Sequence, residues 1–189
     1  MKRGAMIVIV LMAVSAVLVL SHSGAAAPGA AAPSPSVIAS SSPLAGIQFT
    51  DPMHRFQAVF VGAPKSTSTT NPAGVRDETY VYRDPATGIE EFVSILTYPA
   101  GTSPGTVADV SNENAGFFQG AIVSSTPLTF DTYTAVDEVL SIPGNGSPYY
   151  LELGTVLPSN SRVIIIGCSG GANPPTDFAA FANAVTILR

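Results

Sequence analysis

The segment Gly167–Cys168–Ser169–Gly170–Gly171 carries the residues best suited to covalent chemistry, because it fits the pattern G-x-S-x-G after an apolar run. In a nucleophile elbow, this pattern places a serine at a sharp strand-to-helix turn, and an acid and then a histidine follow later in the chain. No histidine follows Ser169, and Pro174 and Pro175 prevent a helix directly after it. We therefore interpret the segment as a glycine-rich loop, and keep a secreted hydrolase using Ser169 as the alternative.

Cys168 is the only cysteine, so no disulfide can form within the chain. Its one possible general base outside the N-terminal leader is His54, far upstream. A reactive thiolate needs an electropositive setting, and the residues next to Cys168 supply no positive charge. We expect Cys168 to be either a buried small apolar residue or a route to a covalent dimer, and a hydrolase using Cys168 belongs to the same alternative as Ser169.

Metal and cofactor chemistry finds no support in the residue pattern. A structural zinc site needs three or four Cys, His or carboxylate ligands, and one Cys with one His cannot supply them. The neighbouring acids Glu90–Glu91 and Asp137–Glu138 fall on expected strands, where adjacent side chains face opposite ways, so we expect solvated or edge-of-sheet acids. No glycine loop has the spacing or the lysine of a phosphate-binding motif. The sequence assigns no catalytic, cofactor-binding or metal residue.

Charge is sparse and acidic, with 8 Lys and Arg against 13 Asp and Glu. Nucleic-acid binding requires a basic face that neutralises phosphates, and the sequence shows none. The same balance disfavours contact with anionic membrane surfaces.

The N-terminus has the pattern of an export signal. Lys2 and Arg3 precede an uncharged run from Ala5 to Leu20, and small residues follow. We expect a signal peptide over residues 1–27, with an uncleaved membrane anchor as the alternative, since the apolar run is long for a signal. Residues 28–43 are almost entirely Ala, Pro, Ser and Gly, which predicts a disordered spacer. The domain is expected over residues 44–189, and the Ala-rich leader and spacer suggest a bacterial protein secreted or held in the cell envelope.

The order of elements in the domain predicts an α+β fold. Strands are expected at Ile47–Phe49, Arg55–Val61, Glu78–Arg83, Glu90–Tyr98, Ala121–Phe130, Asp131–Ile142, Tyr149–Leu157 and Ser161–Cys168, the last as the most buried. Lys65–Val75 is polar and is expected to be a loop. A first helix is expected after Thr106, with Asp109 near its N-terminus and Asn114 interrupting its apolar stripe. A second is expected from Thr176, with Phe178, Phe181, Ala182 and Val185 on one face.

Several of these segments resemble the PsbP-like superfamily, named for an extrinsic subunit of photosystem II. The similarity rests on an early signature and on the sequence of elements after it: Arg55–Phe56, Phe60, Gly62 and Pro64, then Tyr80 and Tyr82, Phe92–Tyr98, a mid-chain helix, Arg162–Ile166, and Phe178, Phe181 and Leu188 at the end. Exported bacterial members of unknown function, including LpqN-type lipoproteins, share this pattern, although this chain lacks their lipidated cysteine. The resemblance implies a largely antiparallel sheet flanked by helices, an αβα sandwich, and a binding or accessory role. It transfers no functional residue.

These observations favour an exported, envelope-associated binding or accessory protein without catalytic activity or cofactor. The expected partner is another envelope protein or a small apolar ligand, contacted through the sheet edge or a pocket between sheet and helix. Nucleic acid is not an expected partner, and a membrane is one only through the leader if that is not cleaved. A passive wall protein with a long spacer is a further alternative.

Overall fold

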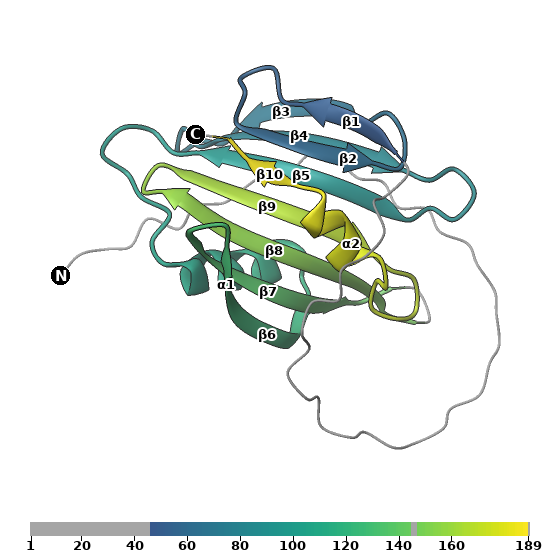
Figure 1. The fold of residues 1–189 in the computed structure, drawn as a ribbon. Helices are drawn as coiled ribbons and strands as arrows, with labels where there is room; N and C mark the ends of the chain where they lie inside the picture. Colours follow the sequence, from purple (N-terminus) through teal and green to yellow (C-terminus); the bar gives the residue numbers. More distant parts are fainter. Residues whose placement is uncertain (1–45, 145–146, 189) are drawn as a thin grey trace.

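The computed structural model describes residues 46–144 and 147–188; the predicted signal peptide and spacer lie outside these residues. Within them the order is five strands, a helix, four strands, a second helix and a short final strand (Figure 1). The elements are β1 (Ile47–Thr50), β2 (Phe56–Phe60), β3 (Lys65–Thr70), β4 (Arg76–Arg83), β5 (Glu90–Thr97), α1 (Val107–Phe117), β6 (Ala121–Phe130), β7 (Tyr133–Ile142), β8 (Tyr149–Ser159), β9 (Arg162–Ser169), α2 (Phe178–Asn183) and β10 (Thr186–Ile187). Neither helix is long and apolar enough to cross a membrane.

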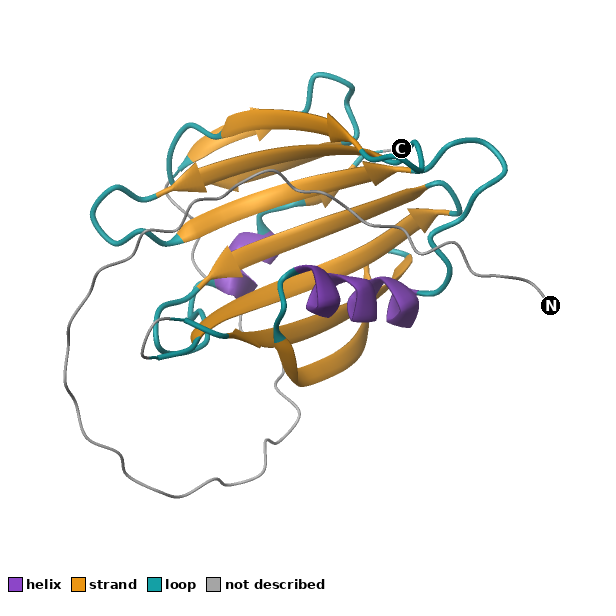
Figure 2. Ribbon diagram, turned by 180° about the vertical axis from the view of Figure 1, so that it is seen from behind, coloured by secondary structure: helices purple, strands orange, loops and turns teal. Residues whose placement is uncertain are grey.

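Seven strands form one antiparallel sheet in the order β3-β4-β5-β9-β8-β7-β6, and β1, β2 and β10 form a second, smaller one. The two helices lie on opposite faces of the large sheet (Figure 2). This arrangement confirms the predicted α+β class with a largely antiparallel sheet flanked by helices. The run predicted to be most buried is β9, the central strand, in which six consecutive residues are buried.

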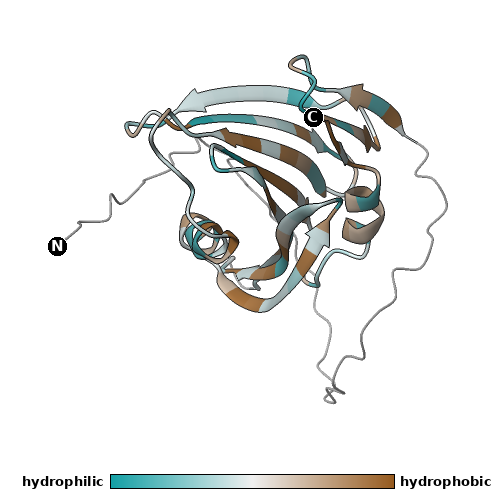
Figure 3. Ribbon diagram, turned by 60° about the vertical axis from the view of Figure 1, so that its left-hand side comes forward, coloured by the Kyte–Doolittle hydropathy of each residue, from teal (hydrophilic) through white to brown (hydrophobic). Residues whose placement is uncertain are grey.

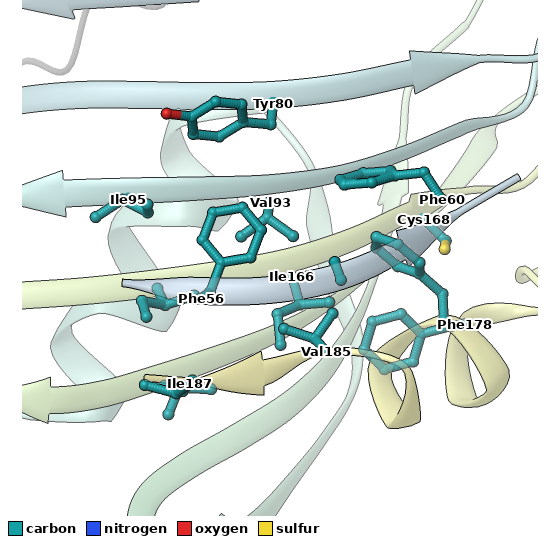
Figure 4. Close-up of a cluster of buried hydrophobic side chains, with 14 of the residues drawn as sticks. Phe56, Phe60, Tyr80, Val93, Ile95, Ile166, Cys168, Phe178, Val185 and Ile187 are labelled. Atoms are coloured by element: carbon teal, nitrogen blue, oxygen red, sulfur yellow. The ribbon is translucent and has the colours of Figure 1, made fainter. Parts of the chain in front are cut away.

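One face of the large sheet is covered by α2 and the small sheet (Figure 4). Alternate residues of β2 point into this layer, so Phe56 and Phe60 are fully buried. Phe181 of α2 packs against Phe60, with the ring centroids 5.2 Å apart. Phe178 lies over Gly154 in β8, where a Cβ atom would approach its ring to 3.3 Å. Full burial of such aromatic side chains contributes about 1.5–3 kcal/mol each.

The opposite face is covered by α1, which packs on β7 and β8 through Val110, Leu140 and Leu153. The predicted start of α1 is confirmed: the Thr106 hydroxyl accepts from the N–H of Asp109, and the Asp109 carboxylate accepts from the N–H of Thr106.

Asn114 does not merely interrupt the apolar stripe of α1. Its side chain is buried, and its Nδ2 donates to Thr155 Oγ1 at 3.1 Å and to Glu138 Oε1 at 3.3 Å. The Ser111 hydroxyl also donates to Glu138. These polar groups satisfy one another across the interface, so they fix the position of the helix on the sheet.

Two sequence predictions were wrong in detail. Lys65–Val75 was expected to be a loop, but Lys65–Thr70 forms the edge strand β3, whose side chains are nearly all exposed and therefore give no apolar alternation. The second helix is only six residues long, because the chain leaves it after Asn183 to form β10 against β2. Thr176 does not cap it, and Val185 is buried beyond its end.

A buried ion network ties the small sheet to the large one. Arg55, which precedes β2, donates to both carboxylate oxygens of Asp51 at 2.7 and 2.8 Å, and also donates to Glu78 of β4. The Tyr80 hydroxyl donates to Asp51 at 2.7 Å. Burial by itself would raise the pKa of Asp51, but the hydrogen bonds from Arg55 and Tyr80 outweigh it and lower that pKa to about 2.

Replacing Arg55 with leucine should therefore lower the free energy of unfolding by about 3–5 kcal/mol, because Asp51 and Glu78 would be left buried without their cation. Urea denaturation followed by circular dichroism measures the loss. The matched control is Arg83→Leu, which removes the partly exposed pair with Glu90 and should cost at most about 1 kcal/mol. Equal losses for the two variants would show that the buried network does not hold the sheets together.

Candidate functional site

The glycine-rich loop after β9 does not form a nucleophile elbow. The Ser169 hydroxyl accepts a hydrogen bond from the backbone N–H of Glu90 at 2.8 Å, so it caps the start of β5. A Cβ atom on Gly167 would collide with the Phe92 ring, and one on Gly170 with the backbone oxygen of Asn173. Close packing therefore explains Gly167 and Gly170, whereas a Cβ atom on Gly171 would meet no atom within 4 Å.

Cys168 and His54 lie in very different surroundings. The Cys168 side chain is 1% exposed within the layer between the large sheet and α2, whereas His54 is exposed in the turn between β1 and β2 with a φ of 54°. Burial and then the charges of Glu91, Glu152 and Asp177 raise the pKa of the Cys168 thiol, which keeps it protonated. Among the described residues, no hydrogen bond joins His54 to Cys168 or Ser169.

The loop borders a small cavity of about 230 Å³, to which Glu91, Cys168, Ser169 and Asp177 contribute. This volume lies below the ~300–1,000 Å³ of typical ligand pockets, and two carboxylates in its lining suit an apolar ligand poorly. Within the part of the chain that the structure describes, no three Cys, His, Asp or Glu side chains are placed to hold a metal ion.

The expectation that Glu91 and Glu138 are solvated acids was wrong. Glu91 is 6% exposed and accepts from the backbone N–H of Val61 at 3.0 Å, and Glu138 is fully buried against α1. Burial raises the pKa of both carboxyl groups. Their hydrogen-bond donors come from segments far away in the sequence, so spacing along the strand does not reveal them.

A carboxylate pair lies on the other half of the sheet, on the face that also carries α2. Asp137 of β7 stands opposite Gly154, and Glu152 of β8 stands opposite Val139, so the two acids are diagonal neighbours. Burial and then the charge of Asp137 raise the pKa of Glu152 to about 7. The Oδ1 atom of Asp137 is buried, and no group in the described residues hydrogen-bonds to it. The pair is thus a concentration of negative charge without a cation.

Strand β6, next to this pair, is the most exposed strand of the large sheet. It runs for ten residues along one edge and pairs only with β7, and nine of its residues are exposed. Ile122, Val123 and Leu128 are 40%, 58% and 37% exposed, and β6 has no charged residue. Figure 3 shows this strand at the outer rim of the curled sheet. Within residues 46–144 and 147–188, no second strand pairs with its outer backbone groups, and such an edge is a setting for protein contact.

The charge around β6 has one sign. Residues 84–161, which contain α1, β6, β7 and β8, hold no Lys, Arg or His. The cations Lys65, Arg76 and Arg83 lie instead on β3 and β4, at the other edge of the sheet. Arg162 begins β9, three strands away from β6. This long stretch without a basic residue is the sequence signal that could have pointed to the surface around β6.

Comparisons with known proteins support the fold of this chain and do not bear on its function. No family model matches the chain, and no curated protein matches it. Cyanobacterial PsbP (CyanoP) from Synechocystis is similar in structure, with a TM-score of 0.50 and 14% identity over 78% of this chain and 97% of that one. A crystal structure from Bacteroides thetaiotaomicron has a TM-score of 0.52 and 10% identity over 77% of this chain, but only 50% of that chain is covered. The domain therefore has a PsbP-like α+β fold.

The thiol of Cys168 should react with a thiol reagent only as fast as the domain opens, because it is buried and protonated. Labelling with an excess of a chromogenic disulfide reagent at pH 8, with and without urea, measures this. Rapid labelling of the native chain would contradict a buried, protonated Cys168 and would favour the alternative of a catalytic cysteine.

Glu152→Gln should alter stability in a pH-dependent way. The pKa of Glu152 is raised on folding, so the folded state takes up a proton, and stability present below about pH 4 is lost as pH rises through 7. The variant should match the parent near pH 4 and exceed it by about 1–2 kcal/mol at pH 8, as measured by urea denaturation. An equal difference at both pH values would contradict the raised pKa.

Proposed function

We propose that this chain is an exported, envelope-associated binding or accessory protein that acts without catalysis, and that β6 is where its domain meets another envelope protein. The observation that carries the proposal is the exposure of β6, ten residues of uncharged edge strand with three exposed apolar side chains. Large apolar residues on an unpaired edge are a hazard for a monomer, since they invite association. They are expected where association is the function.

Three further features support this proposal. The leader and the Ala/Pro/Ser spacer have the composition of an export signal and a tether, which would present the domain at a distance from the membrane or wall. Ser169 and Cys168, the residues of the hydrolase alternative, have packing roles. The cavity beside them is small and acidic and suits an apolar ligand poorly. A second cavity, of about 520 Å³, lies between the start of α1 and the end of β8, so the choice of a protein partner rests on β6 and not on the lack of a pocket.

Site-specific photo-crosslinking in the cells that export the chain tests the proposal. A photoreactive amino acid at Val123, 58% exposed on β6, should give a discrete covalent adduct with another protein. The matched control is Val61, 49% exposed just after β2 in the small sheet, which should give none. Adducts of the same kind from both positions, or none from Val123, would contradict a binding role for β6.

A further inference from the structure

We propose that the partner of β6 is an extended, cationic segment of another protein, which adds a strand to the large sheet and directs a Lys or Arg side chain toward Asp137. This inference rests on the proposed function and specifies the chemistry of its partner. It has three requirements. The edge of the sheet must be able to pair with another strand, the electrostatic potential there must favour a basic partner, and an acid must lie within reach of the added strand.

The edge can accept a strand over a limited length. The backbone groups of β6 that face away from β7 are free to pair, which is how extended peptides bind sheet edges. Pro127 has no N–H to donate, and the pairing with β7 shifts register between Ile122 and Ser124. Both features interrupt a continuous ladder, so a partner strand is restricted to short stretches of β6. This restriction makes the register specific and discourages indiscriminate aggregation.

The negative electrostatic potential around β6 favours a basic partner. Asp131 lies exposed in the turn that joins β6 to β7, and Asp137 and Glu152 lie on the adjoining strands. Asp109 and Glu113 of α1 add further negative charge, and no basic residue falls within residues 84–161. A second copy that met β6 with its own β6 would bring the same acids to the contact, so like-charge repulsion disfavours that symmetric dimer. Residues 4–45 of the chain carry no Lys or Arg and are equally unsuited.

Asp137 lies within reach of the added strand. It stands directly opposite Thr126 of β6, with its side chain on the same face. A partner residue opposite Thr126 would be two strand spacings from Asp137, about 10 Å between Cα atoms. A long Lys or Arg side chain lying across Thr126 can span this distance together with the carboxylate. The Asp137 carboxylate, whose Oδ1 atom is buried without a hydrogen-bond partner in the described residues, would then gain the cationic partner that it lacks there.

Four synthetic peptides provide the probe, each twelve residues long, with Val alternating with Arg, Lys, Glu or Ser. Fluorescence anisotropy measures their binding to the full-length chain, and amide chemical shifts locate the contact. We expect the Arg–Val and Lys–Val peptides to bind at least about tenfold more tightly than Glu–Val and Ser–Val, with shifts confined to β6 and its neighbours. Added salt should weaken this binding.

Two variants with a matched control test the named residues. Asp137→Asn should weaken the Arg–Val peptide about tenfold without loss of folding, since Asp137 has no cation in the described domain. Leu128→Lys should also weaken binding of the Arg–Val peptide about tenfold, because it places a positive charge on β6. Val61→Lys should leave binding unchanged. Circular dichroism of each variant confirms that it folds.

Equal binding of all four peptides, no binding of any, or shifts located away from β6 would overturn the cationic partner. The crosslinking contrast between Val123 and Val61 would still stand in that case, so the failure of this inference is distinct from failure of the binding role. A concentration-dependent dimer joined through β6, seen by analytical ultracentrifugation, would also overturn it in favour of a second copy of the chain.

Discussion

The architecture depends on one buried cation. Arg55 lies at the start of β2 and is surrounded by Asp51 from the same turn and Glu78 from β4, so that a single guanidinium joins two sheets. Burying charges costs several kcal/mol for each ion, and the cost is offset only when the geometry is complete. Here Asp51 also accepts from Tyr80, and the second oxygen of Glu78 accepts from Arg76. The small sheet can therefore occupy one position on the large sheet, and the aromatic layer of Phe56 and Phe60 is closed beneath it.

This closure divides the large sheet into a covered half and a more exposed half. Around β5 and β9 both faces of the sheet are covered. One face lies under α2 and the small sheet, and the other carries the apolar cluster that includes Leu96, Val163 and Val110 of α1. The glycine-rich loop lies in that closed half, which is why its serine and cysteine have packing roles. At the other end nine of the ten β6 residues are exposed. There α1 covers one face of β7 and β8, and the layer of α2 and the small sheet reaches the opposite face at Ala135, with Phe130 and Tyr133 at its margin. The acids that lack cations gather beside β6. The proposed binding edge and the Arg55 network thus lie at different ends of one sheet.

The sequence was sufficient for the parts of the fold set by local pattern. Alternation located β7, apolar residues on both faces located β5, and a Pro- and Gly-rich turn cluster located the start of β8. The run of β-branched residues located β9, and Thr106 with Asp109 located the start of α1. It was not sufficient for β3, whose exposed Ser and Thr residues show no pattern, or for β10, whose two residues become a strand only because β2 lies beside them. The burial of Glu91 and Glu138 was not predicted, for a related reason. Their hydrogen-bond donors, Val61 for the first and Ser111 and Asn114 for the second, are distant in the chain.

The candidate site was hidden by the same limit. The G-x-S-x-G pattern around Ser169 suggested chemistry, but its serine has a packing role. The sequence of β6 shows only weak apolar patterning. Its importance depends on being the edge of a sheet, which is a property of topology. The absence of Lys, Arg and His from residues 84–161 was visible in the sequence, but its meaning required the structure, which places α1, β6, β7 and β8 from that stretch at one side of the sheet, while β5 lies in the other half.

Native-state amide hydrogen exchange on the full chain tests the division into a closed and an open half most directly. The account predicts that amides of β2, β4 and β9 exchange through one common opening, with the free energy of global unfolding, because the Arg55 network makes them a single unit. Alternate amides of β6 should exchange far faster, since they face away from β7. Exchange of β2 through a separate, lower-energy opening, or full protection of β6 in the isolated protein, would contradict the account.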